Sequence, residues 1–346
     1  TTWRLMAARW ASPLVASRMA RNTDAKILFM VFSKLFCVQK YEKKRYCMPQ
    51  KVHFLCTYCP FGVTLQAISY HNTQMAKKQI LLINDMAGYG KVATAAMLPI
   101  LSYMGYPTYN LPTALVSNTL DYGKFNILET TDYIQGVFPI WKELGFHYDA
   151  ISTGFIASER QAGIISRYCT EQAAEGTTIF VDPIMGDEGK LYNGVTEATI
   201  GSMREMIAVA DLIFPNYTEA CYLTSTPFSR QGVTAQEARQ LALALHATGS
   251  KSVLITSIMV DGQPSVVGFN HTSESFFCLP YTEIPVHFPG TGDIFSAVCI
   301  GHLLDGESLK DSTQKAMDAV YTLIDLNKNN TDKNRGIPLE RYLNIL

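Results

Sequence analysis

The chain has 346 residues, of which 47% are hydrophobic and 17% charged, enough for one large α/β domain or two smaller ones. Its net charge of −1 does not indicate a surface that binds nucleic acid, and its longest early apolar run, residues 27–38, is too short to span a bilayer. The eight cysteines show no evenly spaced secreted framework, so we expect reduced thiols and a cytoplasmic location.

Residues 1–74 differ from the rest of the chain in charge and in pattern. They contain eleven Lys/Arg and two Asp/Glu, a net charge of +9, without clear helical or strand periodicity. Three interpretations are open: translation begins at Met75 and the upstream segment is a gene-prediction artefact, the segment is a transit peptide, or it is a genuine extra module. In the third case, Cys56 and Cys59 have the spacing of half a zinc site. The sequence therefore predicts an atypical basic extension, residues 1–74, and a regular domain, residues 75–346.

From Met75 onward, apolar strand-like runs alternate with helical patterns. This alternation implies βαβ units and a mainly parallel sheet with helices on both faces, a three-layer α/β/α sandwich. The expected strands are residues 79–84, 107–116, 150–153, 178–181, 212–214 and 252–255, with an antiparallel pair at 260–269 and 275–281. The expected helices are residues 92–104, 131–144, 158–175, 197–210, 234–248, 293–304 and 308–326.

In open α/β sheets, ligands lie at the carboxyl ends of the strands, so polar residues that follow strands are the candidates for a site. The most specific is a glycine-rich turn, Pro289-Gly290-Thr291-Gly292-Asp293, which runs directly into an apolar helix. Glycines allow close approach to an anion, and a helix N-terminus offers free N–H groups to a transferring phosphoryl group. Asp293 could be the N-cap of this helix, or it could accept the proton of an attacking hydroxyl group.

Three further strand ends carry polar residues with two interpretations each. Asn216 and Glu219 would share one face of a helical turn, where they could bind a ligand or form a capping box. Asp182 could hold a metal-bound water or make an Asx-turn before a proline. Asp85 precedes a Gly-x-Gly turn and could bind a substrate hydroxyl or ring nitrogen. The chain contains no GxxxxGK[ST] sequence, which disfavours a P-loop NTPase.

Taken together and in this order, these motifs resemble the ribokinase-like superfamily, and more closely its bacterial pyridoxal/pyridoxamine kinases. The resemblance runs from about residue 77 to about residue 326. It is carried by residues 181–194 (VDPIMGDEGKLYNG), 215–223 (PNYTEACYL) and 288–297 (FPGTGDIFSA).

The resemblance implies phosphoryl transfer from ATP to a hydroxymethyl group, with Mg²⁺ and a candidate monovalent cation such as K⁺ as cofactors. It also implies a homodimer. Asp293 would be the base for the hydroxymethyl group, and the segment 186–194 would fold over the nucleotide. The remaining implied roles are an anion hole at Gly290, Thr291 and Gly292, ATP contacts at Asp182, Asn216, Glu219 and Thr256, and metal binding at Asp182 and Glu219.

The substrate side of the resemblance is less uniform. Asp85 falls where pyridoxal kinases often carry a serine, while Thr113 and Ser117 match the family's pocket. Leu120 replaces a threonine expected near the pyridine ring. The expected function is therefore phosphorylation of pyridoxal, pyridoxamine or pyridoxine in vitamin B6 salvage. The alternatives are a hydroxymethylpyrimidine kinase of thiamine synthesis and a vitamin-binding pseudokinase without activity.

Overall fold

A computed structural model of the chain describes residues 77–192 and 195–346. The predicted extension at residues 1–74, its CxxC pair and the Met75 boundary lie outside the described residues. In the part that is described, no helix is long and apolar enough to cross a membrane.

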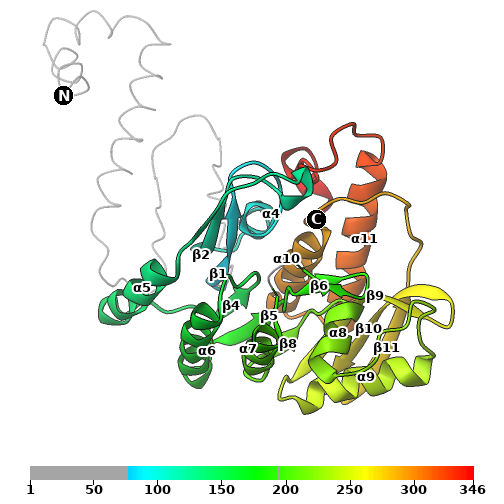
Figure 1. Cartoon of the computed structure of the whole chain (residues 1–346), viewed down its shortest axis with the longest axis horizontal. Coiled ribbons are helices and arrows are strands. Elements are labelled where there is room, and N and C mark those ends of the chain that lie inside the picture. Colours follow the sequence, from blue (N-terminus) through cyan, green and yellow to red (C-terminus); the bar gives the residue numbers. More distant parts are fainter. Residues whose placement is uncertain (1–76, 193–194) are drawn as a thin grey trace, which may run out of the picture. The chain divides into compact units, whose positions relative to one another are not determined.

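A single large sheet organises the described domain (Figure 1). Its strand order is β11-β10-β9-β8-β5-β4-β1-β2-β3, in which the six strands from β9 to β2 are parallel. The edge strands β11 and β3, and β10 next to β11, are antiparallel to their neighbours. The strands of this sheet are β1 (Ile80–Ala87), β2 (Thr108–Val116), β3 (Ile127–Glu129), β4 (Ala150–Thr153), β5 (Thr178–Val181), β8 (Leu212–Ile213), β9 (Ser252–Val260), β10 (Gln263–Asn270) and β11 (Ser275–Pro280).

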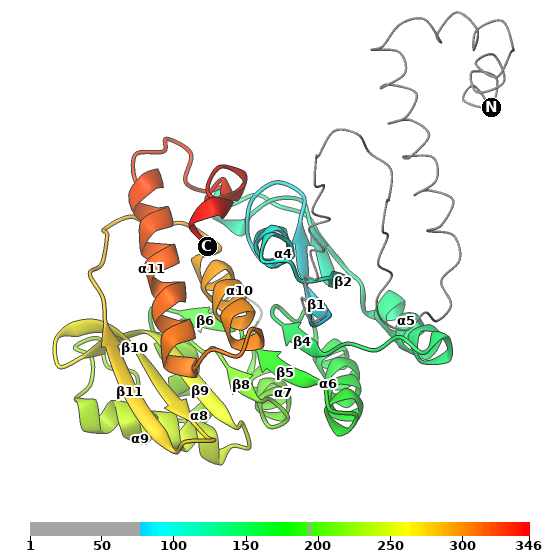
Figure 2. The same ribbon diagram turned by 180° about the vertical axis from the view of Figure 1, so that it is seen from behind.

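Helices cover both faces of the sheet, which confirms the predicted three-layer sandwich (Figures 1 and 2). One face carries α5 (Thr131–Leu144), α6 (Glu159–Ala174), α7 (Glu197–Ile207), α8 (Tyr217–Thr224) and α9 (Ala235–Ala247). The other carries α4 (Thr94–Tyr103), α10 (Thr291–Leu304) and α11 (Leu309–Asn327), followed by the 3₁₀ turns η2 (Leu339–Arg341) and η3 (Leu343–Ile345).

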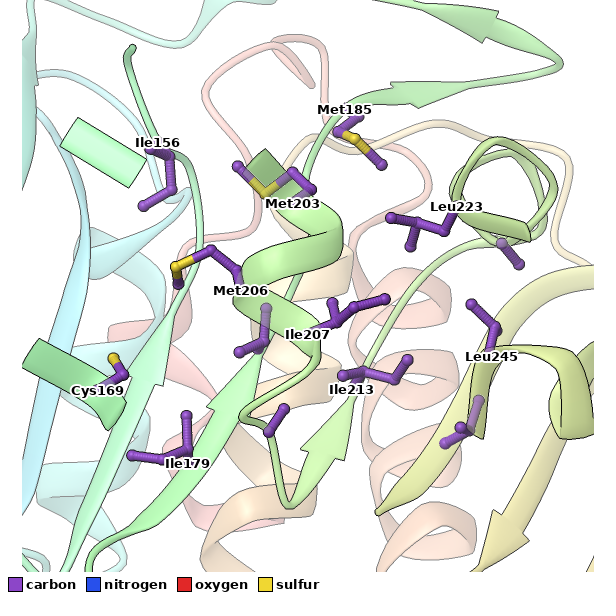
Figure 3. Close-up of a cluster of buried hydrophobic side chains, with 14 of the residues drawn as sticks. Ile156, Cys169, Ile179, Met185, Met203, Met206, Ile207, Ile213, Leu223 and Leu245 are labelled. Atoms are coloured by element: carbon purple, nitrogen blue, oxygen red, sulfur yellow. The ribbon is translucent and has the colours of Figure 1, made fainter. Parts of the chain in front are cut away.

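The two hydrophobic cores follow from the alternation of side chains along the central strands. In β1, Leu81 and Ile83 enter the core beneath α5–α9, whereas Ile80 and Leu82 enter the opposite core, and all four are fully buried. Around α7, methionine side chains from Met203 and Met206 fill the space over β5 and β8 (Figure 3). The sheet is therefore fixed between two packed layers, and its strand ends make a rigid base for a site.

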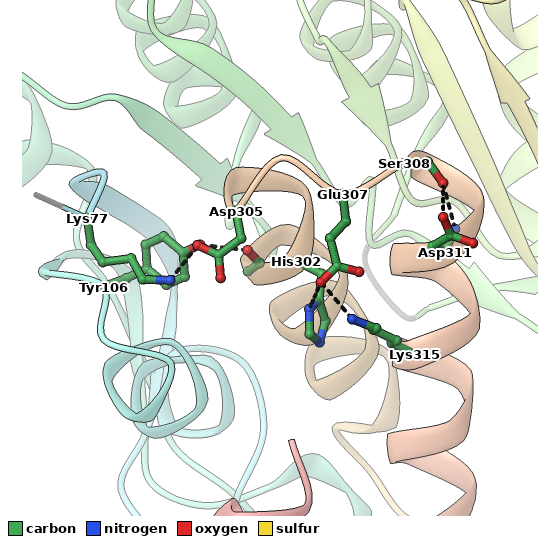
Figure 4. A network of polar contacts seen from close by, with 9 residues as sticks. Lys77, Tyr106, His302, Asp305, Glu307, Ser308, Asp311 and Lys315 are labelled. Carbon is green, nitrogen blue, oxygen red and sulfur yellow. Dashed lines mark hydrogen bonds and ion pairs between the residues drawn. The ribbon is translucent and has the colours of Figure 1, made fainter. Parts of the chain in front are cut away.

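A network of polar contacts fixes the ends of α10 and α11 (Figure 4). Lys77 pairs with Asp305, which also accepts a hydrogen bond from the Tyr106 hydroxyl at 2.7 Å. At the following turn, Glu307 accepts from Lys315 at 2.6 Å and lies 3.0 Å from Nδ1 of His302. These contacts hold α10 at its C-terminal end, and its N-terminal end is the glycine-rich turn.

The structure adds elements that the sequence pattern did not predict. The strand expected at residues 252–255 continues to Val260 through a bulge, where Ser257 has a φ of 54°. A small hairpin, β6 (Gly186–Asp187) and β7 (Lys190–Leu191), follows β5, and a 3₁₀ turn η1 (Leu120–Tyr122) follows β2. After α11, the 3₁₀ turns η2 and η3 near the end of the sequence contact α4.

Candidate active site

The predicted site residues gather at the carboxyl end of the parallel strands. The chain leaves β1 for β2 on one side and then crosses back to β4 on the other, so the order of the strands reverses beside β1. Ligands of open α/β sheets bind at such a reversal. Asp85, Asp182, Asn216 and Thr256 all lie in or directly after these strands, and the N-terminus of α10 brings Asp293 to them.

Asp293 does not cap its own helix. Gly290 is the N-cap of α10, and no side chain makes the capping hydrogen bond. Instead, Oδ2 of Asp293 accepts a hydrogen bond of 2.7 Å from the backbone N–H of Ala93. Ala93 has a φ of 49°, in the left-handed region that non-glycine residues rarely adopt. A strained backbone donor therefore orients one carboxylate oxygen of Asp293.

The turn before α10 presents unused donors beside this carboxylate. In the described part of the chain, the N–H groups of Gly290, Thr291, Gly292 and Asp293 donate to no backbone or side-chain acceptor. Gly290 has a φ of 85°, and a Cβ atom on it would lie 2.3 Å from the carbonyl oxygen of Lys91. The turn therefore needs glycine at this position, and it leaves a cluster of N–H groups at a positive helix end.

Asn84 links the end of β1 to this carboxylate, a role that the sequence did not reveal. Its side chain is buried, and Oδ1 accepts hydrogen bonds from the N–H groups of Asp85 at 2.9 Å and Phe155 at 2.8 Å. A Cβ atom on Gly154 would lie 2.4 Å from the Asn84 amide, so the next strand end packs directly against it. The amide also lowers the pKa of Asp293. The sequence signal for this role was a polar residue at the end of a buried strand, because buried polar side chains are nearly always hydrogen-bonded.

Four acidic side chains of the site, which we call the acidic chain, are linked in series by carboxylates that raise a neighbour's pKa. They are Asp85, Asp293, Asp182 and Glu219. Burial raises the pKa of Asp293 to about 6, although the N–H of Ala93 and the Asn84 amide lower it. Burial, and then the Asp293 carboxylate, raise the pKa of Asp85 to about 7 and hold that of Asp182 well above its ordinary value. Burial, followed by Asp182, also raises the pKa of Glu219. Among the described residues, no basic side chain forms an ion pair with these four.

The geometry around Asp182 and Thr256 favours their availability to a ligand. The Asp182 side chain makes no Asx-turn; its Oδ2 lies 3.5 Å from the Ser296 hydroxyl of α10. Thr256 lies inside β9 at the bulge, and its N–H donates to the carbonyl of Pro215 at 3.0 Å. This bond forms a bridge between Asn216 and Thr256, so both predicted nucleotide contacts stand side by side.

Asn216 and Glu219 form the capping box that the sequence allowed, and they also hold the hairpin β6–β7. Asn216 caps α8, with reciprocal bonds of 3.0 Å and 2.8 Å between each side chain and the other residue's N–H. The Asn216 amide also donates to the carbonyl of Gly186 at 2.8 Å, and Oε1 of Glu219 accepts from the N–H of Met185 at 2.9 Å. Thr218, which the sequence did not single out, accepts from the N–H of Gly189 at 2.8 Å. The base of the hairpin is therefore tied to α8.

The two remaining substrate candidates have different surroundings. Thr113 is fully buried, and its hydroxyl donates to the carbonyl of Phe155 at 2.7 Å, so its proton is already used within the fold. Ser117 is exposed, and its hydroxyl accepts from the N–H of Asn126 at 2.8 Å. Its carbonyl accepts from the N–H of Tyr89 at 3.0 Å, which places it beside the loop after β1. Leu120 is half exposed.

Replacement of Asp85 by Asn is expected to change how stability depends on pH. The folded-state pKa of about 7 lies above the ordinary value of 3.8, so between these values the native state binds more protons than the unfolded state. The Asp85 carboxyl therefore costs stability as the pH rises through this window, and the neutral amide does not. The advantage of Asp85→Asn should grow by about 2 kcal/mol between pH 5 and pH 8, after allowance for partial exposure. Urea unfolding of both proteins at several pH values measures it; parallel stability curves would contradict the assigned shift.

Comparison with known proteins is consistent with this arrangement. Residues 113–338 match the family described as phosphomethylpyrimidine kinase. The pyridoxal kinase of Arabidopsis thaliana is 29% identical over 258 residues, which cover 71% of this chain and 80% of that protein. The pyridoxal kinase PdxY of Deinococcus radiodurans is 26% identical over 272 residues, which cover 73% of this chain and 88% of that protein.

Solved structures show the same fold. A Bacteroides thetaiotaomicron protein, whose name assigns it to the phosphomethylpyrimidine kinases, was crystallised with pyridoxal; it is 35% identical, with a TM-score of 0.73. The match covers 78% of this chain and 96% of that one. The pyridoxal kinase of Lactobacillus plantarum is 27% identical, with a TM-score of 0.69 and coverage of 77% of this chain and 95% of that one.

Proposed function

Because the chain belongs to the phosphomethylpyrimidine kinase family and matches pyridoxal kinases along most of their length, we propose that it transfers phosphate from ATP to the 5′-hydroxymethyl group of a B6 vitamer. The observation that carries the proposal is that the Asp293 carboxylate and the free N–H groups at the start of α10 occupy the same turn. The Asp293 carboxylate would be the base, and the N–H groups would bind the negative charge that develops on the transferring phosphate.

The proposed reaction is an in-line phosphoryl transfer. The vitamer hydroxymethyl group gives its proton to Asp293 as its oxygen attacks the γ-phosphorus of ATP. A new O–P bond forms while the bond from the γ-phosphorus to the bridging oxygen breaks, and ADP leaves with that oxygen. The N–H groups of Gly290, Thr291 and Gly292 would stabilise the charge on the transferring group. The protein's contribution is positioning and charge compensation.

The nucleotide would lie at the N-terminus of α10, along Asp182, Asn216 and Thr256, on the opposite side from the vitamer. The hairpin β6–β7 extends from this point and is fixed at its base by α8. We propose that it covers the phosphates. The same resemblance supports a cytoplasmic homodimer assisted by a monovalent cation such as K⁺.

The donor set at this end of the sheet fits Mg²⁺. Within the described ranges, no group of three or more His, Cys, Asp or Glu side chains is arranged to hold a metal by itself. Mg²⁺ usually binds one or two carboxylates and completes its shell with water and phosphate oxygens. Asp182 and Glu219 would hold the ion, Glu219 through the lone pairs that its bonds to the N–H groups of Met185 and Asn216 leave free. When bound with ATP, the ion would neutralise phosphate charge. It would also offset the acidic chain, for which the described residues supply no basic partner.

Loss of Asn216 or Glu219 is therefore expected to increase the Mg²⁺ requirement. We expect Asn216→Ala or Glu219→Ala to raise the Mg²⁺ concentration for half-maximal rate about tenfold, the range seen when residues around a metal are removed. A matched control is Thr234→Ala, because Thr234 forms the same kind of capping box with Glu237 at the start of α9. The control should lose stability only. If metal titrations of all three variants coincide with that of the unaltered enzyme, the metal role of Asn216 and Glu219 is wrong.

The function itself is tested by ADP release from the full chain with Mg²⁺-ATP and one of four acceptors: pyridoxal, pyridoxamine, pyridoxine or hydroxymethylpyrimidine. We expect turnover of at least one B6 vitamer. Turnover of the pyrimidine alone would instead support a kinase of thiamine synthesis, an alternative favoured by the family description and by Leu120. A folded, ATP-binding protein that turns over none of them would be a pseudokinase, despite its Asp293, Asn216 and Glu219.

A further inference from the structure

The end of the chain contacts the loop that follows β2. We call residues 117–126 the flap loop and residues 328–340 the C-terminal arm. The hydroxyl of Tyr122 donates to Oδ2 of Asp332 at 2.6 Å, and the amide of Asn334 donates to the carbonyl of Asp121 at 3.3 Å. The Thr119 hydroxyl donates to the carbonyl of Asn334. Three side-chain hydrogen bonds therefore join segments about 210 residues apart in sequence, and the red C-terminal segment lies beside this loop in Figure 1.

The same arm is locked to the loop after β1 and to the glycine-rich turn. The N–H of Lys91 donates to the carbonyl of Arg335 at 2.8 Å, and the Lys91 ammonium pairs with Glu340. A Cβ atom on Gly336 would lie 2.8 Å from the Lys91 carbonyl oxygen and 3.2 Å from that of Pro289. The arm thus touches both segments that position Asp293 and the anion site, and it is itself a fixed anchor for the flap loop.

The flap loop and the loop after β1 together present an aromatic surface beside the substrate candidate Ser117. The rings of Tyr89 and Tyr122 lie 6.0 Å apart, and Tyr89 is 54% exposed. The flap loop is joined to the loop after β1 through its backbone, because the N–H of Tyr89 donates to the carbonyl of Ser117 and the N–H of Thr119 donates to the carbonyl of Tyr89, both at 3.0 Å. A pair of tyrosine rings of which one is exposed and the other half-buried, at the edge of a site, is suited to pack against an aromatic heterocycle.

We propose that Asp332 is a positioning residue for the vitamer: its hydrogen bond to Tyr122 holds the flap loop, and with it the Tyr89–Tyr122 wall, against the substrate ring. The inference rests on the proposed function. Asp332 touches neither substrate nor nucleotide, and its effect passes through Tyr122. The carboxylate accepts a hydrogen bond that a neutral amide oxygen could also accept, so the position needs an acceptor more than it needs a charge.

Asp332→Ala is expected to raise the KM for the vitamer roughly tenfold, the loss expected for a hydrogen bond to a charged group, with kcat and the KM for ATP within about twofold of normal. Tyr122→Phe removes the same bond from the other side and should behave alike, and the double variant should be no worse than either single one. Asp332→Asn should restore most of the affinity. The matched control is Asp325→Ala, because that carboxylate pairs with Lys328 and has no bond to the flap loop.

A second measurement does not depend on turnover. Lys124 is an exposed tryptic site within the flap loop, so its cleavage under native conditions reports release of that loop. We expect cleavage about fivefold faster in Asp332→Ala and Tyr122→Phe, but not in Asp332→Asn or Asp325→Ala. Unchanged cleavage and unchanged vitamer KM in both variants would overturn the inference, as would an equal rise in the KM for ATP. Failure of the unaltered enzyme to phosphorylate any vitamer would instead count against the proposed function, and cleavage at Lys124 would still decide whether Asp332 holds the flap.

Discussion

Asp293→Asn is expected to lower turnover by about 10²–10⁴-fold while nucleotide affinity stays nearly unchanged. The Asn side chain has almost the same shape and can still accept the hydrogen bond from Ala93, so the start of α10 should keep its geometry. The amide cannot accept a proton from the substrate hydroxyl, so the variant loses base catalysis. Steady-state kinetics, together with calorimetric titration of ADP, separate the two effects.

The pH dependence of the unaltered enzyme provides an independent check on the same residue. With a pKa of about 6, Asp293 is mainly ionised at pH 7.5 and protonated at pH 5. The rate should therefore fall as the pH drops below about 6, because a protonated carboxyl cannot accept the substrate proton. Asp85→Asn is the matched comparison: it removes the neighbouring carboxylate but leaves the base in place, so its remaining rate should still fall at low pH. An Asp293→Asn enzyme that retained its rate would remove Asp293 from the role of base.

Strands buried on both faces were the easiest features to predict from the sequence. Residues 150–153 and 178–181 have the same bounds in the structure, because short apolar runs between turn residues fit few other places in an α/β sheet. The hairpin β6–β7 was not predicted as strands, since each of its strands has two residues and no periodicity. The bulge at Ser257 was missed because a strand end and a bulge give the same local signal.

Within the site, the sequence identified the side chains better than the way they are held. The four acidic side chains that act on one another in the structure, Asp85, Asp182, Glu219 and Asp293, were all named from the sequence. The N–H of Ala93 could not be anticipated, because its direction depends on a backbone conformation rather than on residue type. The contact between the arm and the flap loop could not be predicted either, since it is made by carbonyl groups and single polar side chains that have no sequence pattern.

Asn216 and Glu219 show that a structural and a functional interpretation of one motif need not compete. Their capping box uses one oxygen of each side chain on the N-terminus of α8, and the remaining polar atoms reach the hairpin at Gly186 and Met185. Stability of the helix and position of the hairpin are therefore set by the same two residues. Substitution at either one should affect both, which is why the capping box of α9 is the appropriate control.

Gly290→Ala is expected to reduce kcat by about 10²-fold or more, the effect of losing a preorganised donor to developing negative charge. The new methyl group would lie 2.3 Å from the Lys91 carbonyl oxygen, which is backbone held by the C-terminal arm and cannot move aside cheaply. The φ of 85° adds strain for any residue with a Cβ atom. The steric clash and the backbone strain can be relieved only if the turn shifts. Its N–H groups would then move away from the transferring phosphate.

Gly306→Ala separates this effect from strain alone. Gly306 follows the other end of α10 with a φ of 92°, and a Cβ atom there meets nothing within 4 Å. Both variants should lose about 1 kcal/mol or more of stability, because each places alanine in the left-handed region, but Gly306→Ala should keep its kcat. Comparable kcat values in the two variants would mean that the turn before α10 does not stabilise the transferring group. A large difference in kcat between variants that share the same backbone strain would mean that the close approach of Gly290 to Lys91 is what aims those N–H groups.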